Sequence, residues 1–263
     1  MELGLNGKRA LLLAATKGLG RAAAQSLAAE GADLVVSSSS QLRCQEVAAE
    51  IEGEYGVRAH GLKADLFDPC SMDLLYEGAC QAMGGVDIVF INHPGPTLGL
   101  AQNIDVHELD RQYRMMLASP IRLISRALPA MRAQRWGRIV SVSGGGMVSP
   151  LPNKVMDNTM RPALAGYSKA LANEVASEGV TLNVLMPGTF ITDRVHASTA
   201  SNAELWGISV EEAMRRRVEN IPAGRFGELT EFGAMVAFIC SQRASYITGS
   251  VLRVDGGQIK STL

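Results

Sequence analysis

Short apolar runs rich in β-branched residues and leucine alternate along the chain with longer, alanine-rich segments whose apolar residues recur at helical spacing. The apolar runs predict strands at 9–13, 33–37, 57–62, 87–91, 138–142, 181–186 and 250–254. The segments between them predict helices at 19–30, 41–54, 69–83, 105–132, 154–178 and 229–241. Repeated strand–helix units feed a parallel sheet covered on both faces, so we expect an α/β fold with a doubly wound parallel sheet.

Length and composition favour a single domain that acts on a small molecule. The 263 residues, 47% of them hydrophobic, are enough to bury one core, and we expect one domain over 1–263. A net charge of −1 gives no electrostatic reason to expect nucleic acid or an anionic membrane as a partner. No apolar run is long enough to span a bilayer and the N-terminus does not resemble a signal peptide, so we expect a cytoplasmic protein. Its four cysteines lack metal-like spacing, and no metal site is expected.

The segment after the first predicted strand has the features of a phosphate-binding loop. It runs from Leu13 to Gly20 and contains Gly18 and Gly20 just where a helix is predicted to begin. Glycine lets backbone approach a pyrophosphate closely, and the N-terminus of the helix attracts the anion. Ala14 is expected to allow the same approach with a negative φ. Two glycines alone are equally consistent with an ordinary tight turn from strand to helix.

The end of the second predicted strand indicates which nicotinamide cofactor is bound. An acidic residue there would accept hydrogen bonds from ribose hydroxyls and repel a 2′-phosphate. This chain instead has Ser37, Ser38 and Ser39, with Lys17 and Arg43 as nearby cations in the sequence. Hydroxyl donors and cations suit a phosphate, which favours NADP(H). The alternative is a polar turn with two solvated charges.

Further motifs follow in order after the later strands. They are Asp65-Leu66, Asn92-His93-Pro94-Gly95, Pro187-Gly188 with Thr192, and a C-terminal set of Pro222 to Gly227, Ala244 to Gly249 and Val254-Asp255-Gly256-Gly257. Together with the first loop, they resemble the short-chain dehydrogenase/reductase family over nearly the whole chain.

The resemblance implies a Rossmann-like fold, a bound dinucleotide, a substrate lid over 189–227 and a homotetramer. The residues that it places against the cofactor follow the carboxyl ends of the strands. They are Ala14, Thr16, Lys17, Gly18, Leu19, Gly20, Ser37, Ser38, Ser39, Asp65, Leu66, Asn92, His93, Gly95, Pro187, Gly188 and Thr192.

The family's usual catalytic residues are replaced in this chain. Family members commonly use a Tyr-x-x-x-Lys pair, in which tyrosine gives a proton to the substrate oxygen, with a serine and an asparagine nearby. Spacing from the flanking motifs puts Asp157 at the tyrosine, Arg161 at the lysine, Gly144 at the serine and Met116 at the asparagine. Tyr167-Ser168-Lys169 has the wrong spacing, and we interpret it as packing or subunit contact.

Three residues remain as candidates for catalysis, with His93 as a further possibility. Arg161 is permanently charged and forked, which suits it to stabilise an oxyanion and not to release a proton. Asp157 lies four residues earlier on the same helix face, where a salt bridge to Arg161 is expected. Ser143 would point to the opposite face of a regular strand, unless the following glycines turn the chain. His93 is expected to titrate near neutral pH or to be only a polar neighbour.

These features predict an NADP(H)-dependent oxidoreductase with an atypical mechanism. Divergent members of the family share an Asn-x-x-Arg segment, here Asn158 to Arg161, and a Thr-Asp-Arg segment, here Thr192 to Arg194. The resemblance implies hydride transfer to a carbonyl or to a conjugated enone, whose enolate takes its proton from water. The alternatives are a catalytically weak nucleotide-binding protein with a regulatory or scaffold role, and a non-redox lyase or isomerase.

Overall fold

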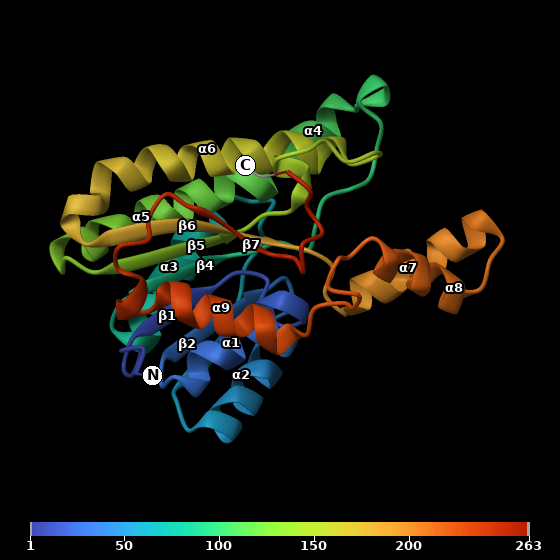
Figure 1. Cartoon of the computed structure of the whole chain (residues 1–263). Helices are drawn as coiled ribbons and strands as arrows, with labels where there is room; N and C mark the ends of the chain where they lie inside the picture. Colours follow the sequence, from blue (N-terminus) through green and yellow to red (C-terminus); the bar gives the residue numbers. More distant parts are fainter. Residues whose placement is uncertain (1, 262–263) are drawn as a thin grey trace.

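The computed structural model, which describes residues 2–261, confirms the doubly wound parallel sheet (Figure 1). Seven strands pair in the order β3-β2-β1-β4-β5-β6-β7. Their bounds are β1 Arg9–Leu12, β2 Asp33–Ser38, β3 Ala59–Lys63, β4 Ile88–Ile91, β5 Gly137–Val142, β6 Val180–Pro187 and β7 Val251–Val254. The predicted strands agree with these bounds to within two residues at each end. Buried parallel strands are apolar on both faces, which makes them easy to recognise in a sequence.

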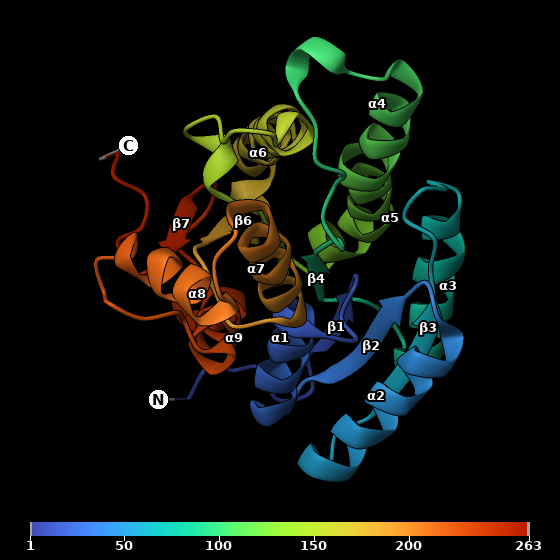
Figure 2. The same ribbon diagram turned by 90° about the vertical axis from the view of Figure 1, so that its right-hand side faces the viewer.

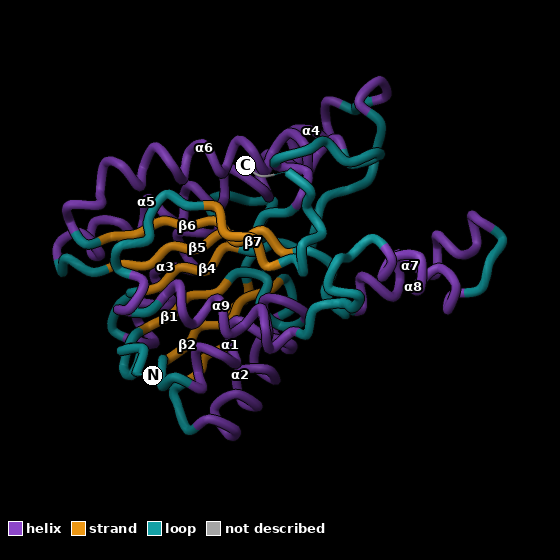
Figure 3. The backbone as a smooth tube through the Cα atoms, in the orientation of Figure 1, coloured by secondary structure: helices purple, strands orange, loops and turns teal. Residues whose placement is uncertain are grey.

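Helices cover both faces of the sheet (Figure 3). They are α1 Gly18–Ala29, α2 Gln41–Tyr55, α3 Ser71–Met83, α4 Val106–Tyr113, α5 Ser119–Ala133, α6 Val155–Val175, α7 Asp193–Trp206, α8 Val210–Glu219 and α9 Leu229–Cys240. One core cluster joins the sheet to α1, α2 and α9 through side chains such as Leu27, Val47 and Phe232. A second joins the other face to α3, α5 and α6 through Leu75, Leu123 and Leu171.

The single helix predicted at 105–132 is wrong in one respect. A π-helical turn at Arg114–Ala118 separates α4 from α5. The extra residue in such a turn rotates the helix face, and here it buries Met115 and Met116. Hydrophobic periodicity continues on either side of the interruption, so the pattern gives no sign of it.

The strand order reverses direction next to β1, and this reversal places the site. From β1 the chain moves outward through β2 to β3, and then returns to β4 on the other side of β1. Leu12 at the end of β1 pairs with Val36 of β2 and with Phe90 of β4, so the loops that follow these strands begin side by side. Ligands of doubly wound sheets bind in the crevice at such a point.

The segment predicted to form a lid, 189–227, contains α7 and α8, which project from the body as a pair (Figures 1 and 2). Its two ends meet at a narrow neck. Gly227 donates its N–H to the carbonyl of Thr189 at 3.0 Å, and Ile191 donates to the carbonyl of Gly227 at 3.3 Å. The Phe190 ring packs edge-on against Phe232 of α9, with centroids 5.6 Å apart. Movement of the pair as a lid stays a prediction.

Two further observations concern the described residues as a whole. Over 2–261 no helix has both the length and the apolar character needed to cross a membrane. Within the same range no three histidine, cysteine or acidic side chains are grouped as metal ligands. The homotetramer expected from the family resemblance stays a prediction, with β7 as the exposed edge strand that such an assembly would use.

Candidate active site

The loop after β1 presents an uncapped helix N-terminus. Lys17 is in extended conformation at the N-cap of α1, no side chain caps the helix, and its first turn contains no acidic residue. Gly18 has a φ of 52°. A Cβ on Gly20 would lie 2.3 Å from the carbonyl oxygen of Ala14, so α1 packs against the loop more closely than any other residue allows. The free N–H groups and the positive end of the helix fit the pyrophosphate of a dinucleotide.

Ala14 differs from the expectation of a negative φ. Its φ is 48°, the left-handed conformation that glycine adopts easily, and its carbonyl accepts a hydrogen bond from Asn92 Nδ2 at 3.2 Å. The turn is therefore glycine-like although the residue is alanine. Asn92 ties the loop after β4 to the loop after β1.

We predict that Ala14→Gly stabilises the protein by about 0.5–1 kcal/mol. Relief of left-handed strain gains about 1–2 kcal/mol, and the greater freedom of glycine in the unfolded chain offsets part of it. The midpoint of urea unfolding checks this. Gly53→Ala is the reverse substitution, in the last turn of α2, where a Cβ meets nothing within 4 Å. A lower midpoint for Ala14→Gly would show that the methyl group of Ala14 contributes packing that outweighs its strain.

The serines at the end of β2 differ in their availability. Ser37 is buried and its hydroxyl donates to the carbonyl of Leu12 at 2.9 Å, so this hydroxyl already has a partner, and contact of Ser37 with the cofactor stays a prediction. Ser38 shares a hydrogen bond with Cys44 Sγ at 3.1 Å. Ser39 and Lys17 are exposed and have no polar partner among residues 2–261, whereas Arg43 pairs with Glu46 at 2.5 Å. Ser39 and Lys17 are the groups free to bind a phosphate.

Asp65 and Leu66, the residues expected near the adenine, form hydrogen bonds that stabilise the loop after β3. The carboxylate of Asp65 accepts the N–H of Phe67 at 2.9 Å, and Ser119 Oγ donates to the carbonyl of Leu66 at 2.8 Å. These bonds fix the loop after β3 beside the end of α5.

The ring of His93 is neutral, contrary to the expectation of titration near neutral pH. Nδ1 accepts the N–H of Gly95 at 3.0 Å, which assigns the remaining proton to Nε2. Burial, with added repulsion from Arg161 and Arg194, holds the pKa of His93 well below its usual range. His93 is therefore a neutral N–H donor.

Asp157 and Arg161 form the predicted ion pair on α6. Arg161 Nε donates to Asp157 Oδ1, and Arg161 Nη1 donates to the carbonyl of Val142, the last residue of β5, at 3.2 Å. The two side chains are only 13% and 7% exposed. Burial lowers the pKa of Arg161 and the charge of Asp157 opposes that effect. The pair fixes a largely desolvated guanidinium at the end of β5, directly over Gly144.

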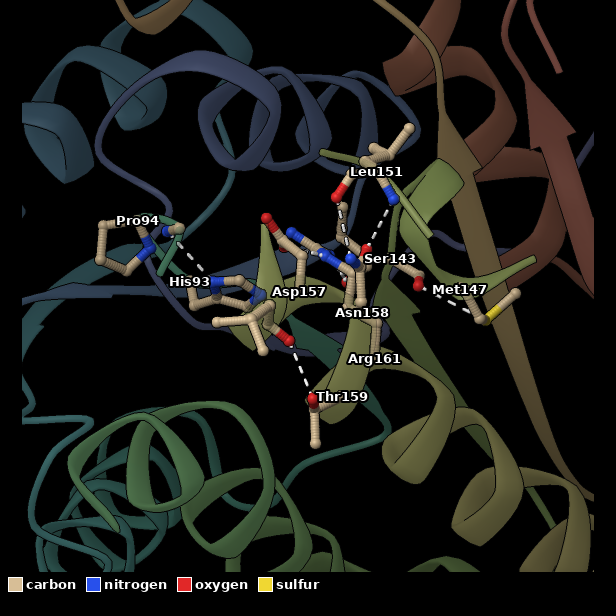
Figure 4. A network of polar contacts seen from close by, with 12 residues as sticks. His93, Pro94, Ser143, Met147, Leu151, Asp157, Asn158, Thr159 and Arg161 are labelled. Atoms are coloured by element: carbon tan, nitrogen blue, oxygen red, sulfur yellow. Dashed lines mark hydrogen bonds and ion pairs between the residues drawn. The ribbon is translucent and has the colours of Figure 1, made fainter. Parts of the chain in front are cut away.

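A small cavity brings the candidate catalytic groups together (Figure 4). Its lining includes His93, Met116, Ser143 and Arg161. Ser143 donates to Met147 Sδ at 3.4 Å, because the chain turns sharply through the 3₁₀ helix Gly145–Met147. Ser143 lines the same cavity as Arg161, which is the arrangement expected if the glycine run turns the chain.

Asn158 positions a loop and is not free to react. Its Oδ1 accepts the N–H of Leu151 at 3.0 Å and its Nδ2 donates to the carbonyl of Leu151 at 2.9 Å. A Cβ on Gly146 would lie 2.6 Å from the same Oδ1. The amide thus holds the loop after β5 against α6.

The neck of the lid contacts the cofactor loops. Thr192 accepts the N–H of Val195 at 3.3 Å as the N-cap of α7, and its methyl group lies 3.5 Å from where a Cβ on Gly18 would be. Gly188 packs so closely against Asp255 that a Cβ would lie 2.7 Å from its Cα. The loop after β6 therefore lies over the loop after β1, where Pro187, Gly188 and Thr192 are expected to meet the cofactor.

Arg194 was not among the predicted site residues. Its Nη1 donates to the carbonyl of Pro94 at 3.0 Å, and its guanidinium occupies the space that a Cβ on Gly95 would need. The Thr-Asp-Arg motif was the only sequence signal for it. The motif does not show which loop the arginine reaches, because that depends on how α7 leaves the neck.

Comparison with known proteins identifies the family. The family model described as Enoyl-(Acyl carrier protein) reductase matches residues 13–258. The 3-oxoacyl-[acyl-carrier-protein] reductase FabG of Aquifex aeolicus is 34% identical over 258 residues, which cover 98% of this chain and 99% of the relative.

Two solved structures share the whole fold. L-sorbose reductase from Gluconobacter frateurii, complexed with NADPH and L-sorbose, has a TM-score of 0.94 and 27% identity, and the match covers 99% of this chain and 100% of that one. YwfH, an NADPH-dependent reductase involved in bacilysin biosynthesis, has a TM-score of 0.91 and 27% identity over 97% and 99% of the two chains. The chain belongs to the short-chain dehydrogenase/reductase family, as its motifs predicted.

Proposed function

We propose that this protein is an NADP(H)-dependent oxidoreductase that delivers hydride to a carbonyl or a conjugated enone of a small molecule, with Arg161, at the position of the usual lysine, stabilising the reacting oxygen. The observation that carries the proposal is the cavity at the end of β5, where Arg161 and neutral His93 lie together. Of the described residues that line this cavity, none is a tyrosine or a lysine. A reaction there needs stabilisation of negative charge more than an acid.

The cofactor assignment rests on the residues around α1 and β2. The uncapped N-terminus of α1 suits a pyrophosphate, and Lys17 and Ser39 are free to contact a 2′-phosphate. L-sorbose reductase and YwfH are both described with NADPH, which supports the same choice. When bound, the nicotinamide would supply the hydride.

Arg161, His93 and Ser143 of the cavity, together with Asp157 beside it, then have roles in the reaction. Arg161 would stabilise the oxygen on which charge develops, since a guanidinium in a desolvated site acts strongly on an oxyanion. His93 would donate its Nε2 proton as a hydrogen bond, as a neutral imidazole can do towards a carbonyl oxygen. Asp157 orients the guanidinium, and Ser143 offers a further hydroxyl. An enolate formed in this way would take its proton from water.

Titration with NADPH and NADH, followed by fluorescence, tests the cofactor. We expect NADPH to bind at least about tenfold more tightly than NADH, because a charged contact to the 2′-phosphate contributes about 1.5–3 kcal/mol. Lys17→Met should remove much of that preference. Arg43→Met is the matched control, since Arg43 is already paired with Glu46.

The other outcomes of this titration separate the alternatives. Equal affinity for both cofactors would contradict the assignment to NADP(H). Binding of neither would defeat the oxidoreductase and leave a different use of the fold. Tight binding with no oxidation of NADPH by any ketone or enone would favour the regulatory or the non-redox alternative.

A further inference from the structure

Four basic side chains gather where the lid meets the body. They are Lys154 just before α6, Arg161 within α6, Arg194 on α7 and Arg217 on α8. Burial lowers the pKa of Lys154, and repulsion from the three arginines lowers it further, while Asp157 opposes these effects. Asp157 is the carboxylate that acts on Lys154, so the group has a large excess of positive charge.

The excess charge is not neutralised within the described chain. Arg161 has Asp157 as its partner. Arg217 Nη1 donates to Ser198 Oγ at 2.9 Å and to Thr199 Oγ1 at 2.6 Å, which are neutral acceptors. Arg194 donates to a backbone carbonyl, and the ammonium group of Lys154 has no hydrogen bond or ion pair with any residue in 2–261. Lys154 and Arg217 are half-buried and have no counter-charge, which is costly, and a bound anion would lower that cost. Arg194 is exposed.

Lys154 and Arg194 contact the two ends of the loop that carries His93. Arg194 lies on Pro94 and Gly95. At the other end, Gly99 forms a bridge to Lys154, with Gly99 N–H donating to Asn153 at 2.9 Å and Val155 N–H donating to Gly99 at 3.3 Å. Lys154 and Arg194, which have no carboxylate partner among residues 2–261, therefore both adjoin the loop that carries His93. This loop follows β4, two strands along the sheet from β2, whose serines a 2′-phosphate would contact.

We infer that the substrate carries a carboxylate, which Lys154 and Arg194 bind next to the group that is reduced. The inference rests on the proposed reductase function and names its substrate class. The planar fork of Arg194 matches a carboxylate, and Lys154 supplies a compact charge from the body side. A carboxylate held by both residues would connect α7 to α6 and favour a lid closed over the substrate.

Calorimetry with matched acids and esters tests the inference. The probes are benzoylformate, levulinate and trans-4-oxo-2-pentenoate, each with its methyl ester, added to the full chain with NADP⁺ and without it. We expect at least one acid to bind about tenfold or more tightly than its ester. Lys154→Met and Arg194→Met should each weaken the binding of that acid by about ten- to a hundredfold and leave the affinity for the ester unchanged. Lys169→Met, the same substitution on an exposed part of α6, is the control.

The results separate failure of the inference from failure of the proposed function. Esters that bind as well as their acids, or acids that do not bind at all, would overturn the carboxylate site. The carboxylate site would also be overturned if Lys154→Met weakens the binding of NADP⁺ and leaves the affinity for the acids unchanged, because the cations would then bind the cofactor. Acid binding that depends on Lys154 and Arg194, in a protein that never oxidises NADPH, would support the anion site and reject the reductase.

Discussion

Replacement of Arg161 by methionine is expected to lower kcat/KM for any ketone or enone substrate by at least about a hundredfold while NADPH still binds. Removal of one preorganised oxyanion donor typically costs a factor of about 10²–10³ in kcat. Arg161 is the only cation of the cavity lining among the described residues, and Asp157 holds its guanidinium in place. Initial rates with NADPH, together with the NADPH titration, give both readouts.

Stability must be separated from catalysis in this experiment. Asp157 is only 7% exposed, and loss of its partner leaves a buried charge that we expect to cost about 3 kcal/mol of unfolding free energy. The double variant Asp157→Asn with Arg161→Met removes that charge and should recover most of the loss in urea unfolding. Its activity should stay as low as that of the single variant.

Recovery of activity in the double variant would contradict the proposed role. It would mean that Arg161 matters only because it neutralises Asp157. Arg161→Lys supplies a further comparison, because lysine retains the charge but not the planar fork that reaches both Asp157 and the carbonyl of Val142. We expect intermediate rates for that variant.

The fold was predictable because its signals are local. The strands inside the sheet contain buried apolar runs, and the glycine, proline and aspartate motifs fall on the loops that follow the strands. Each of these signals depends on a few adjacent residues, so the α/β class and the family could be read from the sequence. The Asp157–Arg161 pair was predictable for the same reason, since both residues lie one turn apart on α6.

The parts that were wrong depend on contacts between distant segments. His93 is neutral because burial lowers its pKa, with added repulsion from Arg161 and Arg194, which approach from α6 and α7, more than sixty residues away in the sequence. Ala14 takes its positive φ where Asn92 of another loop binds its carbonyl. The cation group around Lys154 arises only when the lid helices meet the body. Composition and periodicity do not reveal contacts between segments that are distant in the sequence.

Gly20→Ala is expected to weaken NADPH binding by at least about a hundredfold and to cost about 2–3 kcal/mol of stability. The new Cβ would lie 2.3 Å from the carbonyl oxygen of Ala14 and 2.8 Å from the Cα of Ala15, and both are backbone atoms that cannot rotate away. Overpacking of this kind costs about 1–3 kcal/mol in a well-packed core. Relief requires α1 to move from β1, which displaces the N–H groups that would hold the pyrophosphate.

Displacement of α1 should also disturb the cavity that contains Arg161 and His93. Gly20→Ala therefore tests more than packing. The carbonyl of Ala14 that the new methyl group would strike is the one that holds Asn92, the residue before His93. Gly166→Ala is the matched control, because Gly166 is exposed on α6 and its new Cβ meets nothing within 4 Å. We expect this substitution to stabilise the helix by about 0.5–1 kcal/mol. Urea unfolding and NADPH titration of both variants decide the matter. Normal NADPH affinity in Gly20→Ala would mean that the dinucleotide does not rely on this turn, and the cofactor site proposed at the N-terminus of α1 would have to be abandoned.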